Sequence, residues 1–475
     1  MLLALILVTP ALAGLAFALP SGKDRVWLLP VGGALNLLLA LAAIFFGAAP
    51  ALGGWIALDP LGKLFLGFGA VLFGLLSAYA PGYLHLRAER PNRVMVACLL
   101  VFPGITNAVL LSHHLGLMWV ALEASTLATA PMIYFNRNAR SLEAVWKYLL
   151  IGSVGIALAL LGSLFLAYAE LHENLVASLR LEDLERIAPS LSRPWLRTAF
   201  VLTFIGYGTK MGLAPMHTWK PDAYGEAPGL VGALLAGSMT SCAFLAVLRF
   251  FHICVAAGEA AFTRELMVGF GLLSMGVAAA FMVKQHDYKR LLAYSSVEHM
   301  GILVLGMGLG GNATFGSLLH LLNNGMTKGV LFLSAANIHR AYATKSVEET
   351  RGALRLVPWS ASLFLLGFIA ITGSPPFGPF VSEFTILEVA VREGRYVVTA
   401  LFLTFLLIIF VGMSSTVLSV VQGKPPAHLA RPHRQETFLL LAPIVIFLTC
   451  SLVLGLYLPP PLEALLREAA GVGVP

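Results

Sequence analysis

The sequence contains few charged residues. Only 12% of its 475 residues are Asp, Glu, Lys or Arg, whereas hydrophobic residues make up 58%. A soluble globular chain has about 25% charged residues, so this composition excludes a water-soluble protein and also a disordered one. Because one bilayer-spanning helix uses about 20 apolar residues, the chain is long enough for up to about fourteen spans.

Cysteine is also scarce, with only Cys98, Cys242, Cys254 and Cys450 present. These residues form no CxxC motif and no Cys/His pair with metal-ligand spacing, and three of them lie within apolar runs. We therefore expect no disulfide framework, no iron–sulfur cluster, no metal and no other cofactor in this chain. A segment polar enough for a soluble domain is missing as well, so any redox or nucleotide chemistry would belong to partner subunits.

Long uncharged runs indicate where the helices lie. Residues 26–58, 396–423 and 437–462 carry no charged side chain. The apolar start of the chain has no basic residue before it, so we expect a first spanning helix there and not a signal peptide. The pattern predicts an all-α polytopic membrane protein with about 14 transmembrane helices, at residues 2–19, 26–48, 62–82, 93–112, 115–135, 143–168, 197–217, 229–251, 266–284, 290–309, 314–337, 357–390, 397–421 and 437–457.

Lysine and arginine are unevenly distributed among the predicted loops. Most of them, including Lys220 and Lys289, follow odd-numbered spans. Basic loops face the cytoplasm, so we expect a multi-pass protein of a prokaryotic inner membrane with both termini outside. The excess of 31 Lys and Arg over 24 Asp and Glu therefore reflects topology, and we expect contact with lipids and no nucleic-acid binding. The long connection at 169–196 is predicted to form a short amphipathic helix on the outer surface.

Two predicted spans are interrupted at matching places. The seventh breaks at Gly212 and Pro215, and the twelfth breaks across residues 373–378. Each is the fourth member of a five-helix set, which indicates two inverted five-helix repeats with a site between them. Ordinary proline kinks are the alternative. The predicted organisation is an N-terminal segment of three helices, two repeats and a last helix, at residues 1–92, 93–251, 265–421 and 422–475.

Four ionisable residues lie well inside predicted spans: Glu123, Lys210, Lys328 and Glu383. A charge at the centre of a bilayer helix costs about 2.5–3.5 kcal/mol, so such residues are usually functional. Burial favours the neutral form of a lysine and a nearby carboxylate favours the charged form. A lysine in this setting can gain and lose a proton, which is what a stepwise proton relay requires. Candidate intermediate carriers are His217, Glu298, His299 and His320.

Each of these residues also has a simpler interpretation. Glu123 and Lys210 would equally form a static ion pair between two helices. His320 would be a hydrogen-bonded core histidine, and Lys328 would extend its ammonium group toward the membrane surface. Asp59, just ahead of the third span, is interpreted as a helix-start residue.

At these positions the sequence resembles a known family. The stretch GYGTKMGLAPMHTWKPDA at 206–223 resembles a motif of the antiporter-like proton-translocating subunits of respiratory complex I, membrane-bound hydrogenases and multi-subunit cation/proton antiporters. The segments EAVWKYLLIGS at 143–153, LLAYSSVEHMG at 291–301 and HLLNNGMTKGVLFL at 320–333 look like family motifs too. The amino-acid sequence of the 206–223 stretch is most similar to the formate-hydrogenlyase type of hydrogenase membrane subunit.

The resemblance implies roles for individual residues. The family's helix-five glutamate and helix-seven lysine match Glu123 and Lys210. Its helix-eleven histidine and lysine match His320 and Lys328, and its helix-twelve acid matches Glu383. Three positions depart from the family, because Ser241 replaces a frequent helix-eight lysine, Asn324 a second helix-eleven histidine and Tyr224 a histidine after the PDA motif.

We therefore expect a proton-translocating membrane subunit of a redox complex, most similar to a membrane-bound hydrogenase. The predicted proton path is Glu123, Lys210, His217, Ser241, His299, His320, Asn324, Lys328 and Glu383. The resemblance implies other membrane subunits and a peripheral cytoplasmic redox arm as partners, with iron–sulfur and nickel–iron centres there. The alternatives are a cation/proton antiporter subunit, an NADH:quinone oxidoreductase subunit, and an energy-coupling subunit for a non-redox partner. Two lysines and few acids in the interior favour protons over sodium as the coupling ion.

Overall fold

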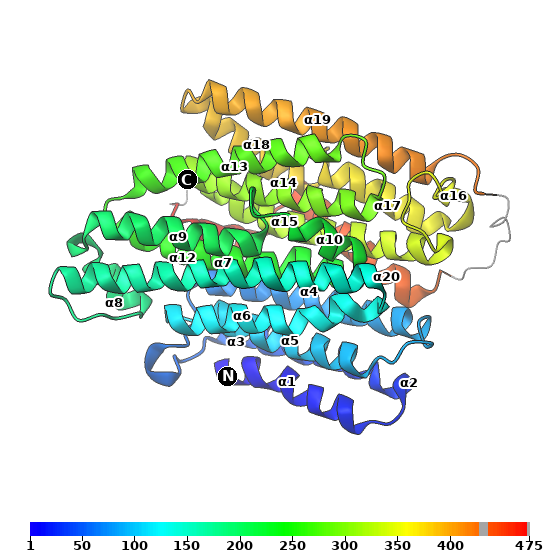
Figure 1. The fold of residues 1–475 in the computed structure, drawn as a ribbon, viewed down its shortest axis with the longest axis horizontal. Coiled ribbons are helices and arrows are strands. Elements are labelled where there is room, and N and C mark those ends of the chain that lie inside the picture. Colours follow the sequence, from blue (N-terminus) through cyan, green and yellow to red (C-terminus); the bar gives the residue numbers. More distant parts are fainter. Residues whose placement is uncertain (427–435, 473–475) are drawn as a thin grey trace.

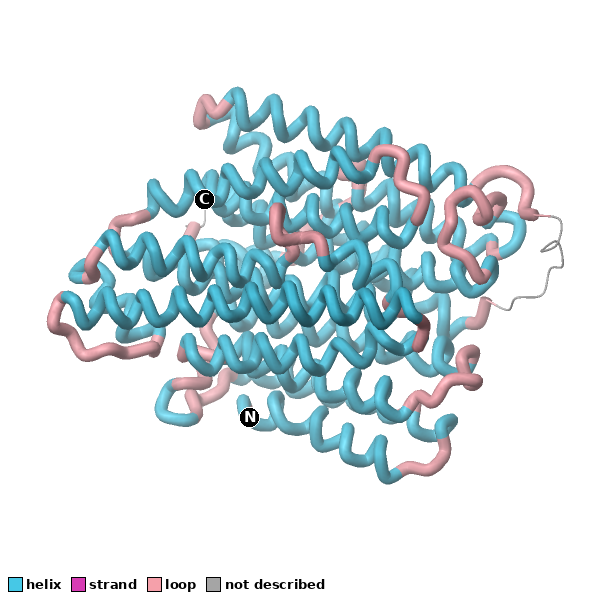
Figure 2. The backbone as a smooth tube through the Cα atoms, in the orientation of Figure 1, coloured by secondary structure: helices cyan, strands magenta, loops and turns pink. Residues whose placement is uncertain are grey.

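The computed structural model describes residues 1–426 and 436–472, so residues 427–435 and 473–475 of the predicted segment 422–475 lie outside the described part. Within that part the chain is helical throughout, and its only extended pairings are isolated bridges (Figure 2). The all-α prediction is thereby confirmed.

The helices follow the predicted spans closely in sequence. The first half of the chain contains α1 Leu2–Ala18, α2 Gly22–Arg25, α3 Leu28–Phe46, η1 Leu52–Gly54, α4 Pro60–His85, α5 Arg93–Leu111, α6 Leu115–Ile133, η2 Tyr134–Asn136, α7 Ala139–His172, α8 Leu181–Ile187, η3 Ala188–Ser190, α9 Arg193–Met211, α10 Trp219–Glu226, α11 Gly229–Leu234, the π-helix η4 Leu235–Met239 and α12 Thr240–Ala256. The second half contains α13 Ala260–Met282, α14 Tyr288–Leu309, α15 Asn312–Tyr342, α16 Ala353–Leu356, α17 Pro358–Ile371, α18 Gly378–Arg392, α19 Tyr396–Val421, α20 Phe438–Leu456 and α21 Pro460–Ala470.

The composition of these helices makes the chain a multi-pass membrane protein. Ten helical segments of the described residues are long and apolar enough to cross a membrane. The helices α1 and α17 are apolar but shorter. Long helices run side by side, with α8 at one end of the bundle and α16 at the other (Figure 1). The connection predicted at 169–196 and the connection between the spans predicted at 314–337 and 357–390 therefore lie at opposite ends (Figure 1).

The interior of the bundle holds titratable side chains within a mostly apolar core, and large apolar side chains also lie on the outside. An 18-residue stretch of α14 and one of the segment from α11 to α12 are completely buried, whereas only 22% and 28% of the corresponding stretches of α19 and α20 are buried. Exposed positions include large apolar side chains such as Phe45, Phe46 and Val397, while Lys210, His320 and Lys328 are buried. This distribution suits lipid outside and titratable groups inside.

Both predicted helix breaks are present. The seventh span ends at Met211 and resumes at Trp219 as α10, and the twelfth ends at Ile371 and resumes at Gly378 as α18. A break frees backbone carbonyls that lipid cannot satisfy. At the first break, the Trp219 indole N–H donates to the Thr209 carbonyl at 2.9 Å, and the Ala214 N–H donates to Ser274 Oγ at 3.0 Å. Protein groups thus complete the interrupted hydrogen-bond ladder.

One prediction about the loops needs correction. Lys220 and Lys289, which hydropathy placed in cytoplasmic loops, lie in α10 and α14 and are buried, and their ammonium groups bind backbone carbonyls. The short helix predicted within 169–196 is present as α8, followed by the one-turn η3, although α7 continues to His172 and α9 begins at Arg193.

Asp59 caps α4, as predicted for a helix-start residue. Its Oδ1 accepts the Gly62 N–H at 2.9 Å and the Arg249 Nη2 at 3.0 Å. Burial raises the pKa of the Asp59 carboxyl, but the Arg249 guanidinium and His113 outweigh burial and hold that pKa well below its usual range. The pair joins α4 to α12 at the end of the bundle.

Helices α7 and α9 approach each other through glycine. A Cβ at Gly206 of α9 would lie 2.5 Å from the Ala159 nitrogen and 2.6 Å from the Gly155 carbonyl oxygen of α7. Real side chains do not come this close to backbone atoms. Small residues allow such backbone contact between membrane helices, and this contact fixes the position of Lys210 one turn further along α9.

Gly206→Ala should therefore lower the thermal unfolding midpoint of the purified protein. The added methyl group forces α7 and α9 apart, at a cost of about 1–3 kcal/mol. Gly269→Ala is the matched control, because a Cβ at this exposed position of α13 meets nothing within 4 Å and alanine favours helix. Equal midpoints for the two variants would contradict the close contact.

Candidate functional site

Glu123 and Lys210 form the first part of the site. The Lys210 ammonium lies 4.0 Å from Glu123 Oε2, and Thr126 Oγ1 donates to the same oxygen at 3.2 Å. Lys210 occupies the last turn of α9, where the helix dipole favours a cation. Its side chain is only 1% exposed, whereas that of Glu123 is 25% exposed. The pair thus joins a buried cation to a more accessible carboxylate.

Lys220 lies directly beyond the helix break. Its ammonium donates to the Met211 carbonyl at 2.5 Å and to the Ser296 carbonyl at 3.3 Å. Met211 follows Lys210 in sequence, and Ser296 lies on α14. The Tyr224 ring lies 5.7 Å from the same ammonium. Lys220 therefore connects the end of α9 to α14 through a fully buried positive charge.

Lys328 projects from α15 toward α14. Its ammonium donates to Ser295 Oγ at 2.7 Å and approaches the Leu292 carbonyl at 3.4 Å. Glu298 lies one turn after Ser295 on α14 and is buried as well. Lys328 thus contacts the same helix that carries Glu298 and that accepts Lys220 at the Ser296 carbonyl.

A histidine pair follows toward the second break. Nδ1 of His299 and Nε2 of His320 are 2.9 Å apart, and Nδ1 of His320 is 2.9 Å from Ser382 Oγ. All three residues are fully buried. Because a neutral imidazole has one donor and one acceptor nitrogen, this arrangement forms a hydrogen-bonded chain from α14 through α15 to α18.

Glu383 ends the row against the second break. A Cβ on Gly373 would lie 2.2 Å from Glu383 Oε2, so only glycine leaves room for this carboxylate. Gly373 also has a φ of +65°, which glycine adopts without strain. The break therefore creates the space that Glu383 occupies.

Three side chains of this row could also be considered as metal ligands. Ligand atoms of His299, His320 and Glu383 all lie within 4.8 Å of one another. However, the direct contact between the two imidazoles requires a proton between their facing nitrogens, and a metal needs those lone pairs free. The geometry suits proton exchange better than metal binding.

The remaining predicted site residues lie beside this row. His217 is buried in the first break, near the rings of Phe281 and Tyr294. Asn324 is buried on α15, between His320 and Lys328 in sequence. Ser241 is buried on α12, where its hydroxyl donates to the Gly237 carbonyl in the π-helix at 2.5 Å. Among the described residues, this hydroxyl makes no hydrogen bond to a lysine.

Several buried polar atoms of the row have no hydrogen-bond partner among the described residues, namely Lys210 Nζ, His217 Nδ1, Tyr224 Oη, His299 Nε2, Asn324 Oδ1, Glu383 Oε1 and both side-chain heteroatoms of Asn323. Buried polar atoms are nearly always hydrogen-bonded, to ordered water where protein groups are out of reach. Their clustering along one row indicates a hydrated interior.

Sequence reasoning missed four members of this row: Lys220, Ser295, Asn323 and Ser382. Lys220 lies three residues after His217, but its flanking residues made it look like part of a loop. A signal was available, because Lys220 immediately follows a helix break, where freed carbonyls attract a cation. The two serines act as contacts between helices, which a single sequence does not reveal.

A helical membrane protein with a buried row of titratable side chains is the class that this fold and site define. The family model described as "NADH:quinone oxidoreductase/Mrp antiporter, TM" matches residues 112–409. The chain belongs to this family, and it is an antiporter-like membrane subunit.

Individual relatives agree with this assignment. The chain is 34% identical over 406 residues to "Hydrogenase-4 component F homolog" of Methylacidiphilum infernorum, covering 83% of each chain. It is 31% identical over 360 residues to "NADH-quinone oxidoreductase subunit N" of Desulforudis audaxviator, covering 74% of this chain and 70% of that one. A chain of respiratory complex I from Thermus thermophilus superimposes with a TM-score of 0.79 at 26% identity, covering 99% of this chain and 100% of that chain. Its relatives of known structure are thus chains of multi-subunit membrane complexes.

Proposed function

We propose that this subunit relays protons through its interior along the row from Glu123 to Glu383. Protons enter near Glu123 and Lys210, pass Lys220 and Lys328, and reach Glu383 through His299 and His320. The observation that carries the proposal is the hydrogen-bonded histidine pair between a buried lysine and a buried carboxylate. Charges are too costly in a membrane interior to serve packing alone.

The relay uses changes of partner to move a proton. When Glu123 is close, it stabilises the charge on Lys210, and when the carboxylate moves away, burial favours release of the proton. The 4.0 Å separation and the accessible side chain of Glu123 are suited to this movement. Hydrated side chains then carry the proton laterally, because each neutral imidazole accepts on one nitrogen and donates from the other.

We infer an architecture of about 14 spans for this function. The ten apolar spans are joined by the shorter or more polar helices α1, α9, α15 and the pair α17 and α18. Two inverted repeats of five helices each would bring the two breaks to equivalent places, as in transporters with a midplane site. In this arrangement the protein lies in the inner membrane with both termini outside.

The partners are inferred to be those of a membrane-bound hydrogenase-like complex. The 34% identity to the hydrogenase-4 component F homolog supports this choice over the other members of the family. Other membrane subunits would adjoin this chain, and a peripheral cytoplasmic arm would hold iron–sulfur and nickel–iron centres. Purifying the native complex and identifying its subunits tests the proposal, and co-purification with a cation/proton antiporter assembly alone would contradict it.

A cation/proton antiporter subunit is the second candidate, because the matching family model includes Mrp antiporters. The described interior holds three lysines against three carboxylates along the row, and a sodium site prefers an excess of oxygen ligands. An NADH:quinone oxidoreductase subunit and an energy-coupling subunit for a non-redox partner use the same relay. Sodium dependence of transport separates the antiporter from the others.

Lys210→Met should abolish proton translocation while the complex still assembles. Methionine keeps the volume and apolar stem of lysine but holds no proton. The measurement is acidification in proteoliposomes containing the complex, with Lys284→Met at an exposed turn as the control. Wild-type rates in the Lys210 variant would make the ion pair with Glu123 a static one.

Lys220 provides a sharper test of the middle of the path. Lys220→Arg keeps the positive charge and the carbonyl contacts that a structural role requires, but arginine does not release its proton. We expect this variant to assemble and to translocate protons at a background rate. Lys289→Arg is the matched control, because Lys289 is another buried lysine bound to carbonyls, outside the row. Normal translocation by both variants would exclude Lys220 from the relay.

Ser241 remains a predicted member of the path through α12. We expect Ser241→Ala to slow proton transfer modestly, because neighbouring water persists, and Ser241→Leu to block transfer by displacing that water. Proton transfer by both variants is measured in the same proteoliposomes. A Ser241→Leu complex that matches the wild type would place the route entirely along Lys220.

A further inference from the structure

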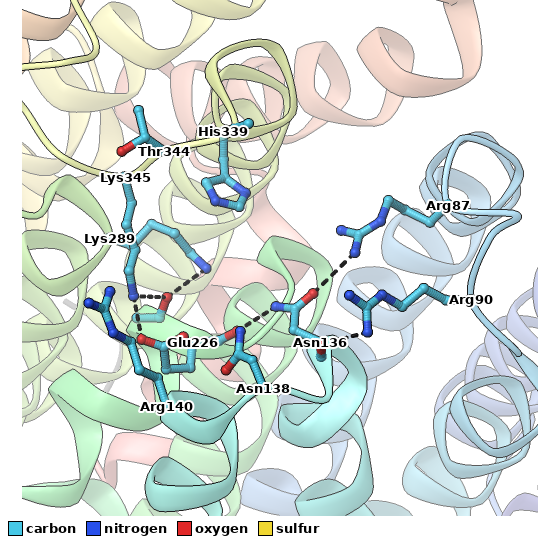
Figure 3. A pocket seen from close by; sticks show the side chains of 12 residues that line it. Arg87, Arg90, Asn136, Asn138, Arg140, Glu226, Lys289, His339, Thr344 and Lys345 are labelled. Carbon is cyan, nitrogen blue, oxygen red and sulfur yellow. Dashed lines mark hydrogen bonds and ion pairs between the residues drawn. The ribbon is translucent and has the colours of Figure 1, made fainter.

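A second cluster of charged side chains surrounds a cavity at one end of the helix bundle. The cavity has a volume of about 330 Å³ and lies where α4, α10 and α15 end and where α7 and α14 begin. Its charged lining residues are Arg87, Arg90, Arg140, Glu226, Lys289 and Lys345. Arg87 and Arg90 approach from one side, and Lys289, Lys345 and Arg140 approach from the other (Figure 3).

Positive charge in this cavity exceeds negative charge. Five cationic side chains face one carboxylate in the lining. Glu226 is already paired with Lys345 at 2.5 Å, and Lys345 also lies 3.4 Å from Asp287. Arg140 has no ion pair or hydrogen bond among the described residues. Cations that converge on one cavity repel one another unless an anion joins them.

Lys289 shows that the cavity is a built feature and not a group of surface charges. Its side chain is only 3% exposed, and its ammonium donates to the carbonyls of Gly225 at 2.9 Å and Ala227 at 2.6 Å. The described residues offer this ammonium no carboxylate within ion-pair distance. An ammonium has three N–H donors, so one donor remains for a ligand.

Asn136 holds the two arginines on the other side. The Arg87 guanidinium donates to Asn136 Oδ1 at 3.3 Å, and Arg90 Nη1 donates to the Asn136 carbonyl at 2.5 Å. The Asn136 amide in turn donates to the Glu226 carbonyl at 2.9 Å. These bonds orient both guanidinium groups. Arg87 also pairs with Glu89 at 2.8 Å and donates to the Tyr83 hydroxyl at 3.4 Å, whereas most N–H donors of Arg90 remain unused within the described part of the chain.

We propose that this cavity binds a phosphate group, supplied by free phosphate or by a phospholipid headgroup. A phosphate has several acceptor oxygens and matches the forked N–H donors of arginine. A single carboxylate has fewer acceptor oxygens and would bind the N–H donors of only one side of the cavity. The volume is at the lower end of the range for ligand sites, which suits one small anionic group. Its position at the helix ends is where membrane headgroups and aqueous anions are both available. This inference is independent of the proton relay.

The test measures the thermal unfolding midpoint of the complex in phosphatidylcholine nanodiscs. A ligand that binds only the folded state raises this midpoint. One arm adds inorganic phosphate, with chloride at equal ionic strength to correct for screening. The other arm replaces part of the phosphatidylcholine by phosphatidylglycerol. A rise in the first arm identifies free phosphate as the source, and a rise in the second arm alone identifies the lipid.

The variants Arg90→Gln and Arg140→Gln should weaken binding of the effective probe about tenfold or more, because each loses a charge-assisted hydrogen bond. Arg140 is exposed and unpaired, so its variant is expected to fold normally. Arg137→Gln is the matched control, because Arg137 is exposed three residues earlier and does not line the cavity. The proposal is overturned if neither probe stabilises the wild type beyond chloride and phosphatidylcholine, or if Arg137→Gln weakens binding as much as the other two variants.

Discussion

The exclusion of water from the membrane interior is the constraint on which the rest of this structure depends. Every charge and every freed backbone carbonyl inside the bundle needs a protein or hydrated partner. The first helix break illustrates this requirement, since it interrupts a backbone ladder that neighbouring groups complete. One of these groups is the ammonium of Lys220, which binds the Met211 carbonyl. The hydrogen bond that satisfies this freed carbonyl thus places a titratable side chain in the interior.

The placement of the buried polar residues follows from the same constraint. Apolar side chains cover the outside, and polar residues concentrate on α14, α15 and the ends of α9 and α18. The serines on α14 and α18 connect these charges between helices. Ser295 holds Lys328, and Ser382 contacts His320. Small hydroxyl residues therefore define the geometry of the row, although the larger titratable residues carry its chemistry.

Two groups of cations have different surroundings in this molecule. In the interior row, Lys210 faces the carboxylate of Glu123 on a neighbouring helix, and Lys328 binds Ser295 one turn before Glu298, an arrangement suited to changes in charge. In the cavity beside Asn136, cations exceed carboxylates in the lining, and Lys289 and Arg90 are held by backbone carbonyls with no carboxylate partner among the described residues, an arrangement suited to a permanent positive charge. The difference in partners explains why the first group is assigned to proton transfer and the second to anion binding.

The sequence by itself determined the class of protein, the placement of the apolar helices and the two breaks. These features depend on composition and on local residue types, such as Gly212 and Pro215, which act within a few positions along the chain. It also identified Glu123, Lys210, Lys328 and Glu383, because a charge within an apolar run is conspicuous. Only the tertiary structure decided that Lys220 and Lys289 are buried, that His299 meets His320, and that five cations surround one cavity. The physical reason is that these contacts join helices far apart in sequence, and the side chains that each helix presents to its neighbours depend on packing.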